Sequence, residues 1–218
     1  MNFNILESNP RLEKDSNLIL IIGMYRSGTV WCFNLIKTML ETVYGAENVY
    51  ARYRTDWVES EASGKKHLLM KFHEYDDRLV KRSNFTVFSE RDYNSMISSM
   101  NRMHEVDKNT DIETLDYMHP SFKKRVLSDS VKYRNVANYT FNYDNLLNDK
   151  LVIASSLASK MNILTGKMNE SNKINYEQLV KILREVESIP NSSHLKDTGS
   201  RDINTLMHKN HKSDKFNI

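Results

Sequence analysis

The stretch LILIIGMYRSGTVW, residues 18–31, decides the fold class. It opens with five aliphatic residues, 18–22, that stop at Gly23, which is typical of a short strand buried on both faces. After Gly28, the apolar residues of 29–44 recur at helical spacing. Strand, glycine turn and helix in this order form the first unit of an α/β protein. We therefore expect residues 18–22 to form a central strand of a parallel sheet.

The rest of the chain continues this alternation of strands and helices. Short β-leaning runs predict strands at 48–53, 67–72 and 85–89, with a further candidate near 136–143. Helical spacing of apolar residues predicts helices at 93–103, 123–134, 151–161 and 176–187. Such alternation is typical of parallel strands joined by crossover helices. The predicted fold class is α/β, a P-loop-containing three-layer α/β/α architecture with a central parallel sheet.

The length of 218 residues, of which 39% are hydrophobic, suits one core and is short for two full domains. We expect a polar N-terminal segment over 1–17 and a single domain over 18–218. The tail after about residue 200 is a candidate mobile segment. The polar stretches 105–121 and 188–202 are predicted to be loops of that domain.

Composition limits the partners and the location. The 31 Lys and Arg residues against 28 Asp and Glu give a net charge of +3, without a long basic block, so we expect no nucleic-acid partner. The most apolar window, 18–22, is far below the roughly 20 residues of a membrane span. A single cysteine, Cys32, and an N-terminus without a signal-peptide layout favour a cytoplasmic location. No heptad run indicates an oligomeric state.

The glycine turn is a candidate anion site. It follows a buried strand and opens a helix, so the backbone N–H groups of 26–30 would converge on an anion at the positive helix end. ATP- and GTP-binding loops continue Gly-Lys-Ser/Thr, whereas Gly28 is followed here by Thr29 and Val30. The alternative is an ordinary tight turn that needs glycines for its geometry alone.

Arg26 supplies a cation inside this loop, beside the hydroxyls of Ser27 and Thr29. This set suits a phosphate-like group held without a metal ion. The later strands end at KFH, residues 71–73, and at ERD, residues 90–92, neither of which is a strong magnesium site. We therefore expect no metal site.

Lys71, His73 and Arg91 all follow predicted strands. In an open parallel sheet, ligands bind outside the carboxyl ends of the strands, so these three side chains are expected near the glycine turn. Ser98 and Ser99 lie about two turns into the next predicted helix. Taken singly, each residue is as well explained by a surface or capping position.

The ordered motifs resemble those of the sulfotransferases that use 3'-phosphoadenosine 5'-phosphosulfate (PAPS), both the cytosolic kind and their shorter bacterial relatives. YRSGTVW, residues 25–31, resembles the 5'-phosphosulfate loop of that family, and KFH, 71–73, resembles the Lys-Thr-His segment that supplies its catalytic base. Residues 88–100 resemble the 3'-phosphate motif, with an arginine and a serine eight residues apart. FNYDNL, 141–146, is a weaker match. The resemblance runs from residue 18 to about 163.

This resemblance implies a PAPS-dependent sulfotransferase that moves the sulfuryl group to a hydroxyl or amine of a small-molecule or glycan acceptor and leaves adenosine 3',5'-bisphosphate. It implies His73 as general base, Lys71 as stabiliser of the transferring oxygens, and Arg26 as a third catalytic group. The donor-binding positions that it implies are Arg26, Ser27, Gly28, Thr29, Val30, Trp31, Arg91, Ser99, Tyr143 and Lys209.

The sequence departs from the family pattern in three places. Arg26 replaces the usual lysine, and Val30 replaces a second threonine. The C-terminal Arg-, Lys- and Gly-rich segment is not evident; residues 205–211, with Lys209 and Arg201, are a candidate replacement, and a chance pair of histidines in a mobile tail is the alternative.

The acceptor is not readable from the sequence. Its pocket is expected in the loops 52–64, 105–121 and 188–202, where aromatic residues either line it or merely pack: Tyr53, Trp57 and Tyr117. Two other functions stay open, an ATP-dependent small-molecule kinase and a non-catalytic nucleotide-binding module.

Overall fold

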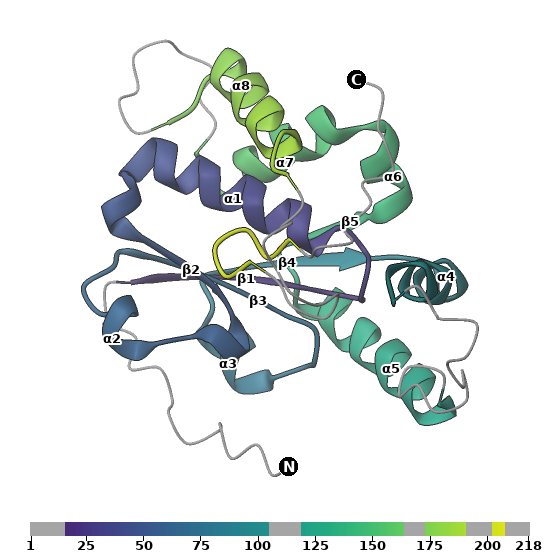
Figure 1. Ribbon diagram of the computed structural model, residues 1–218. Coiled ribbons are helices and arrows are strands. Elements are labelled where there is room, and N and C mark those ends of the chain that lie inside the picture. The colour runs from purple at the N-terminus through teal and green to yellow at the C-terminus, as the bar shows by residue number, and fades with distance from the viewer. Residues whose placement is uncertain (1–15, 105–118, 164–172, 191–201, 208–218) are drawn as a thin grey trace.

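Five parallel strands form the central sheet of the computed structural model, which describes residues 16–104, 119–163, 173–190 and 202–207 (Figure 1). Their order across the sheet is β2-β3-β1-β4-β5, and each neighbouring pair is parallel. The strands are β1 (Asn17–Gly23), β2 (Val49–Tyr53), β3 (His67–Phe72), β4 (Phe85–Glu90) and β5 (Tyr139–Asn142). The predicted α/β class and the central position of the first strand are confirmed.

Helices cover both faces of this sheet, in three layers (Figure 1). On one face lie α1 (Thr29–Tyr44), α6 (Tyr143–Asn148), α7 (Lys150–Lys160) and α8 (Tyr176–Glu187). On the other lie α2 (Glu59–Ala62), α3 (Asp77–Arg82) and α5 (Pro120–Val136), with α4 (Tyr93–His104) beside α5. Short 3₁₀ turns, η1 (Ala46–Asn48) and η2 (Arg54–Asp56), flank β2. No helix in the described ranges is long and apolar enough to cross a membrane.

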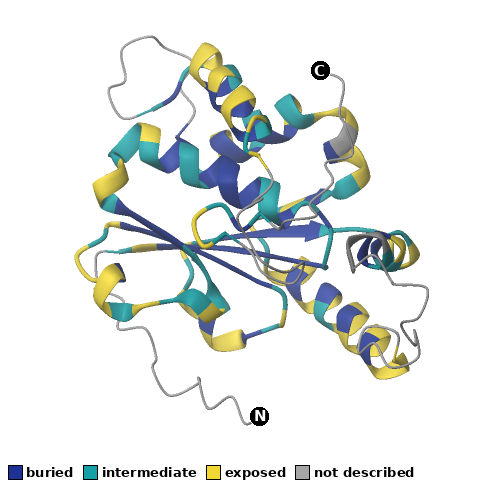
Figure 2. Ribbon diagram, in the orientation of Figure 1, coloured by how far each residue is buried: buried dark blue, intermediate teal, exposed yellow. Residues whose placement is uncertain are grey.

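The strands supply both halves of the core, and Figure 2 shows them as deeply buried. Ile19 and Ile21 of β1 pack with α1, α7 and α8, while the alternate residues Leu18, Leu20 and Ile22 pack with α2, α3 and α5. Because both faces of β1 are buried, its sequence is an unbroken aliphatic run. Burial of each of these side chains contributes about 1.5–3 kcal/mol to stability.

The short helices α2 and α3 were given no bounds from the sequence, and two further helical segments differ from the sequence-based expectation. Helix α5 begins at Pro120 rather than at residue 123, because the proline takes the first turn and the His119 side chain accepts a hydrogen bond from the Ser121 N–H. Helix α6 was not predicted. It has six residues, begins after the capping side chain of Asn142, and is too short to show helical periodicity.

Candidate functional site

The glycine turn joins β1 to α1 with two residues in the left-handed region, Arg26 (φ 56°) and Gly28 (φ 86°). A Cβ on Gly28 would lie 2.6 Å from Leu146 Cδ2, and one on Gly23 would lie 2.3 Å from the Ser89 carbonyl oxygen. Both glycines are therefore required by packing and backbone geometry, whatever the loop binds. Only the groups around these glycines can therefore indicate an anion site.

The first turn of α1 offers the main-chain donors of such a site. This helix has 16 residues, and Gly28 at its N-cap provides no side-chain hydrogen bond. The first N–H groups of a helix have no intrahelical partner, and the helix dipole favours an anion there. Thr29 is buried at this end, and Val30 packs partly buried against the core.

Serine hydroxyls hold the loop against β4. Ser27 is fully buried, and its Oγ lies 2.5 Å from the Met24 carbonyl oxygen and 3.1 Å from that of Ser89. In return, Ser89 Oγ donates to the Ser27 carbonyl oxygen. One hydroxyl proton cannot serve these carbonyls and a ligand together. In this structure the Ser27 side chain supports the loop, and its contact with a donor stays a prediction.

The predicted cations and their partners converge beside the loop. Arg26 Nε donates to Ser99 Oγ at 3.2 Å, and Arg91 Nη1 donates to the Arg26 carbonyl oxygen at 2.6 Å. The Arg91 guanidinium carbon lies 4.0 Å from the ring centre of Tyr143. These contacts arise because β4 pairs with β1, and Ser89 is the register partner of Gly23. Arg26, Arg91, Ser99 and Tyr143, chosen from distant motifs, form one cluster.

Arg91 has spare hydrogen-bonding capacity. Its Nε is buried and has no hydrogen-bond partner in the described part of the protein. A buried donor without a partner destabilises a fold by about 1–3 kcal/mol, so such groups indicate a missing ligand, water or ion. Arg52 Nε, on β2 away from the loop, is in the same state, so the unpaired Arg91 Nε does not by itself identify an anion.

On the other side of β1, β3 brings Lys71 and His73 to the same edge. His73 Nδ1 lies 2.7 Å from the Gly23 carbonyl oxygen, and Lys71 Nζ lies 3.0 Å from His73 Nε2. Lys71 is only 4% exposed, and its Nζ lies 4.8 Å from the ring centre of Tyr53. The Tyr25 ring stacks on the imidazole, with centroids 4.1 Å apart.

These contacts assign the state of His73. A carbonyl oxygen only accepts, so Nδ1 carries a proton and Nε2 of the neutral ring accepts from Lys71. Two positive charges 3.0 Å apart would repel by about 5 kcal/mol at an effective dielectric constant of about 20. A neutral imidazole beside a charged lysine is therefore the compatible pair.

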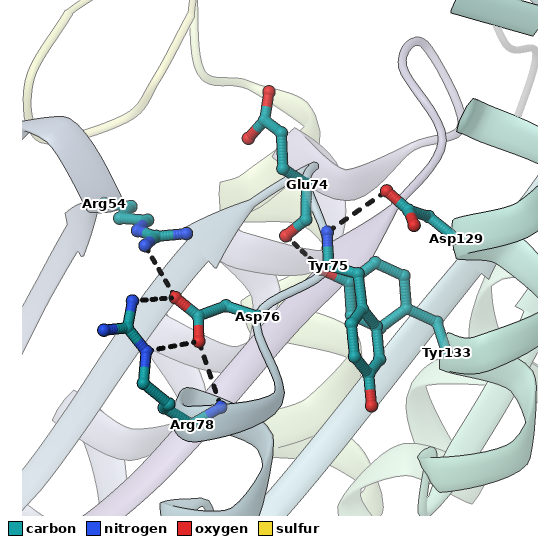
Figure 3. Close-up of polar contacts among 7 residues, drawn as sticks. All are labelled: Arg54, Glu74, Tyr75, Asp76, Arg78, Asp129 and Tyr133. Carbon is teal, nitrogen blue, oxygen red and sulfur yellow. Dashed lines mark hydrogen bonds and ion pairs between the residues drawn. The ribbon is translucent and has the colours of Figure 1, made fainter. Parts of the chain in front are cut away.

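The turn after His73 is held by three side-chain attachments (Figure 3). The Tyr133 hydroxyl on α5 donates to the Glu74 carbonyl oxygen. Asp129, also on α5, accepts a hydrogen bond from the Tyr75 N–H at 3.3 Å. These contacts tie the turn to the helix that covers this face of the sheet.

Asp76 supplies the third attachment (Figure 3). Its carboxylate lies 2.7 Å from Arg54 Nη2 and 3.2 Å from Arg78 Nη2, and it caps α3 by accepting from the Arg78 N–H. Burial alone would raise the pKa of Asp76, but the hydrogen bond from Arg78 and the charge of Arg54 hold that pKa below its usual value. The turn is thereby joined to η2 as well.

The sequence reasoning missed these supporting residues. Asp76 had a local signal, since an aspartate preceding a helix is a common N-cap. Asp129 and Tyr133 had none, because their role depends on how α5 packs on the sheet.

A small cleft, partly open to solvent, lies beside His73. Tyr25, His73 and Tyr133 contribute to its walls, and Glu74, Arg125 and Asp129 bring charges to it. The Tyr25 hydroxyl donates to Glu74 at 2.9 Å. Burial, together with the Glu74 carboxylate, raises the pKa of Tyr25, so its hydroxyl stays protonated at neutral pH.

Other predicted positions lie elsewhere or outside the described ranges. Trp31 Nε1 donates to Glu187 of α8 at 2.8 Å, and Lys150 binds the same carboxylate at 2.5 Å. Trp57 packs edge-on against Tyr50, on the face of the sheet that α2, α3 and α5 cover. This supports a packing role for Trp57 rather than a place in an acceptor pocket. Residues outside the described part of the chain are Tyr117, Arg201, His208, Lys209 and His211.

Of the candidate C-terminal segment 205–211, the structure describes residues 205–207. The Thr205 carbonyl oxygen accepts from Asn34 Nδ2 at 2.8 Å, and Leu206 is buried in the core beside α1. The chain therefore returns to the helix that begins at the glycine turn.

Comparison with known proteins identifies similar folds. Mouse sulfotransferase SULT7A1, complexed with PAP, is 14% identical, with a TM-score of 0.58 over 93% of this chain and 77% of that one. Retinol dehydratase, in complex with androsterone and the inactive cofactor PAP, is 13% identical, with a TM-score of 0.56 over 89% of this chain and 73% of that one. Neither a family model nor a curated protein matches the sequence. At these identities the likeness establishes a sulfotransferase-like fold.

Proposed function

We propose that this protein transfers the sulfuryl group of PAPS to a hydroxyl or amine of an acceptor. One observation carries the proposal: the glycine turn has the Arg26, Arg91 and Ser99 cluster on one side and the Lys71 and His73 pair on the other. A nucleotide with anionic groups at both its 5' and 3' ends needs such cations and helix-end donors, and a transfer reaction needs a base beside them. The fold likeness to two proteins solved with PAP supports the same donor.

The residues present fit the donor. The uncapped first turn of α1 and the Arg26 side chain would hold the 5'-phosphosulfate. Arg91, whose Nε lacks a partner among the described residues, and Ser99 would hold the 3'-phosphate. The Arg26 side chain already reaches Ser99, so the two ends of the donor site are linked.

The chemistry assigned to this chain is proton removal and charge stabilisation. His73 Nε2 would take the acceptor's proton as the acceptor oxygen or nitrogen bonds to sulfur and the S–O bond to the 5'-phosphate breaks. Lys71 and Arg26 would stabilise the sulfuryl and leaving oxygens. Adenosine 3',5'-bisphosphate leaves, and His73 returns its proton to water. The acceptor would have to approach His73 from its Nε2 side, where Lys71 and the Tyr53 ring lie.

Two alternatives remain as outcomes of the same test, an ATP-dependent small-molecule kinase and a nucleotide-binding module without catalysis. Calorimetric titration with adenosine 3',5'-bisphosphate, 5'-AMP, and ATP with magnesium separates them. We expect tight binding of the bisphosphate, weak binding of AMP and no need for magnesium. Preferred binding of ATP with magnesium would replace the proposal by the kinase. Tight bisphosphate binding, without turnover of PAPS across a broad acceptor screen, would favour the binding module.

A further inference from the structure

His73 is held so that only one of its nitrogens can act as a base. Its Nδ1–H donates a hydrogen bond to the Gly23 carbonyl oxygen, with an N···O distance of 2.7 Å, and the stacked Tyr25 ring fixes the plane of the imidazole. The lone pair of Nε2 is the remaining site for a proton.

That lone pair is already engaged. Lys71 Nζ lies 3.0 Å from Nε2, and the side chain is almost wholly buried beside the Tyr53 ring. A charged donor makes a strong hydrogen bond, and burial reduces competition from water. While this bond persists, Nε2 cannot accept a proton from an acceptor hydroxyl or amine.

We propose that Lys71 keeps the base occupied until a sulfated donor binds, so that His73 becomes competent only with the donor in place. This inference rests on the proposed function. The sulfuryl oxygens carry negative charge and would attract the Lys71 ammonium away from Nε2, which exposes the lone pair. Adenosine 3',5'-bisphosphate has no sulfuryl group and leaves the bond intact. Donor binding before acceptor binding is then the productive order.

The first experiment uses the protein without nucleotide. Diethyl pyrocarbonate modifies unprotonated imidazole nitrogens, and peptide mapping by mass spectrometry measures the rate at His73. In Lys71→Met we expect that rate to rise about tenfold or more, since a charged hydrogen bond no longer occupies Nε2. Lys66→Met is the matched control, because it removes a lysine just before the other end of β3. Exposed His119 serves as an internal reference.

Equal rates at His73 in the wild type and in Lys71→Met would overturn the proposal. Histidine ¹⁵N NMR then tests whether the ring stays in place. We expect the Nδ1–H tautomer to persist in Lys71→Met. A faster reaction accompanied by loss of that tautomer would mean that the ring had come loose, and would also count against the proposal.

The second experiment follows the His73 Nε2 resonance as nucleotides are added to the wild-type protein. We expect PAPS to move the His73 Nε2 chemical shift toward its value in Lys71→Met. Adenosine 3',5'-bisphosphate is expected to leave the shift that marks the Lys71–His73 hydrogen bond unchanged. If calorimetry shows that both nucleotides bind but Nε2 does not respond to PAPS, the gating role fails while the proposed function stands. If neither nucleotide binds, the proposed function fails, and the modification rates still decide whether Lys71 occupies the base.

Discussion

Arg91→Met is expected to remove selectivity for the 3'-phosphate while leaving the loop folded. Methionine keeps an apolar stem against Tyr143 and loses the guanidinium, including the buried Nε that has no partner in the described residues. A hydrogen bond to a charged group contributes about 1.5–3 kcal/mol. At about 1.4 kcal/mol for each factor of ten, the loss is roughly 10- to 150-fold in affinity for the bisphosphate.

The assay compares the dissociation constants of adenosine 3',5'-bisphosphate and 5'-AMP in each protein. Their ratio cancels a general effect on the loop, which is needed because Arg91 Nη1 also donates to the Arg26 carbonyl oxygen. We expect the ratio of AMP to bisphosphate constants to fall by the factor above. Arg134→Met is the control, since it removes an exposed arginine that pairs with Glu90 one residue before Arg91. An unchanged ratio, with both ligands weakened equally, would refute the assignment.

Three further changes test the other side of the site. His73→Ala should lower turnover by about 10²–10⁴-fold with bisphosphate affinity kept, and an unchanged rate would remove the histidine from its role. Tyr133→Phe deletes the hydroxyl that donates to the Glu74 carbonyl, so urea denaturation should show a loss of about 0.5–1.5 kcal/mol; no loss would mean that this bond contributes nothing net. The pKa of Asp76 is lower in the folded protein than in the unfolded chain, where it is near 4. Its ion pairs therefore stabilise the fold fully at pH values above the unfolded pKa, and this stabilisation is lost as the pH falls through the folded pKa. Asp76→Asn keeps a capping side chain, so its urea midpoint should depend less on pH below 4 than the wild type's, and parallel curves would contradict this.

The main elements of the sheet were predictable because local pattern and burial agree. Residues 18–22 have no polar position, so their pattern suits a strand covered on both faces, and they lie in the central strand of the sheet. The proximity of Arg91 to the loop that carries Arg26 follows from the rule that parallel strands bring their carboxyl ends to one edge. The choice of Ser99, which lies in α4, came from the resemblance to the sulfotransferase 3'-phosphate motif and not from this rule.

The orientation of individual groups was not predictable in the same way. Ser27 was expected to face a donor, yet in this structure its hydroxyl lies against main-chain carbonyls, because the loop packs tightly on β4. The attachment of Tyr133 and Asp129 to the turn after His73 depends on the packing of α5 across the sheet. A sequence pattern gives the buried face of such a helix, but not the partner of each side chain.

Gly23 joins the two halves of the site through its main chain. Its carbonyl oxygen accepts a hydrogen bond from His73 Nδ1–H, and the space where a side chain would begin is filled by the Ser89 carbonyl of the neighbouring strand. Comparison of side chains gives little sign of such a junction, because apart from the imidazole and the missing side chain of Gly23 it consists of main-chain atoms. A three-dimensional template could detect it. The template would contain a residue without a side chain at the end of the central strand, a backbone oxygen of one neighbouring strand packed against that residue, and an imidazole just beyond the end of the other neighbouring strand. Such a template would find distant relatives whose loop residues have diverged.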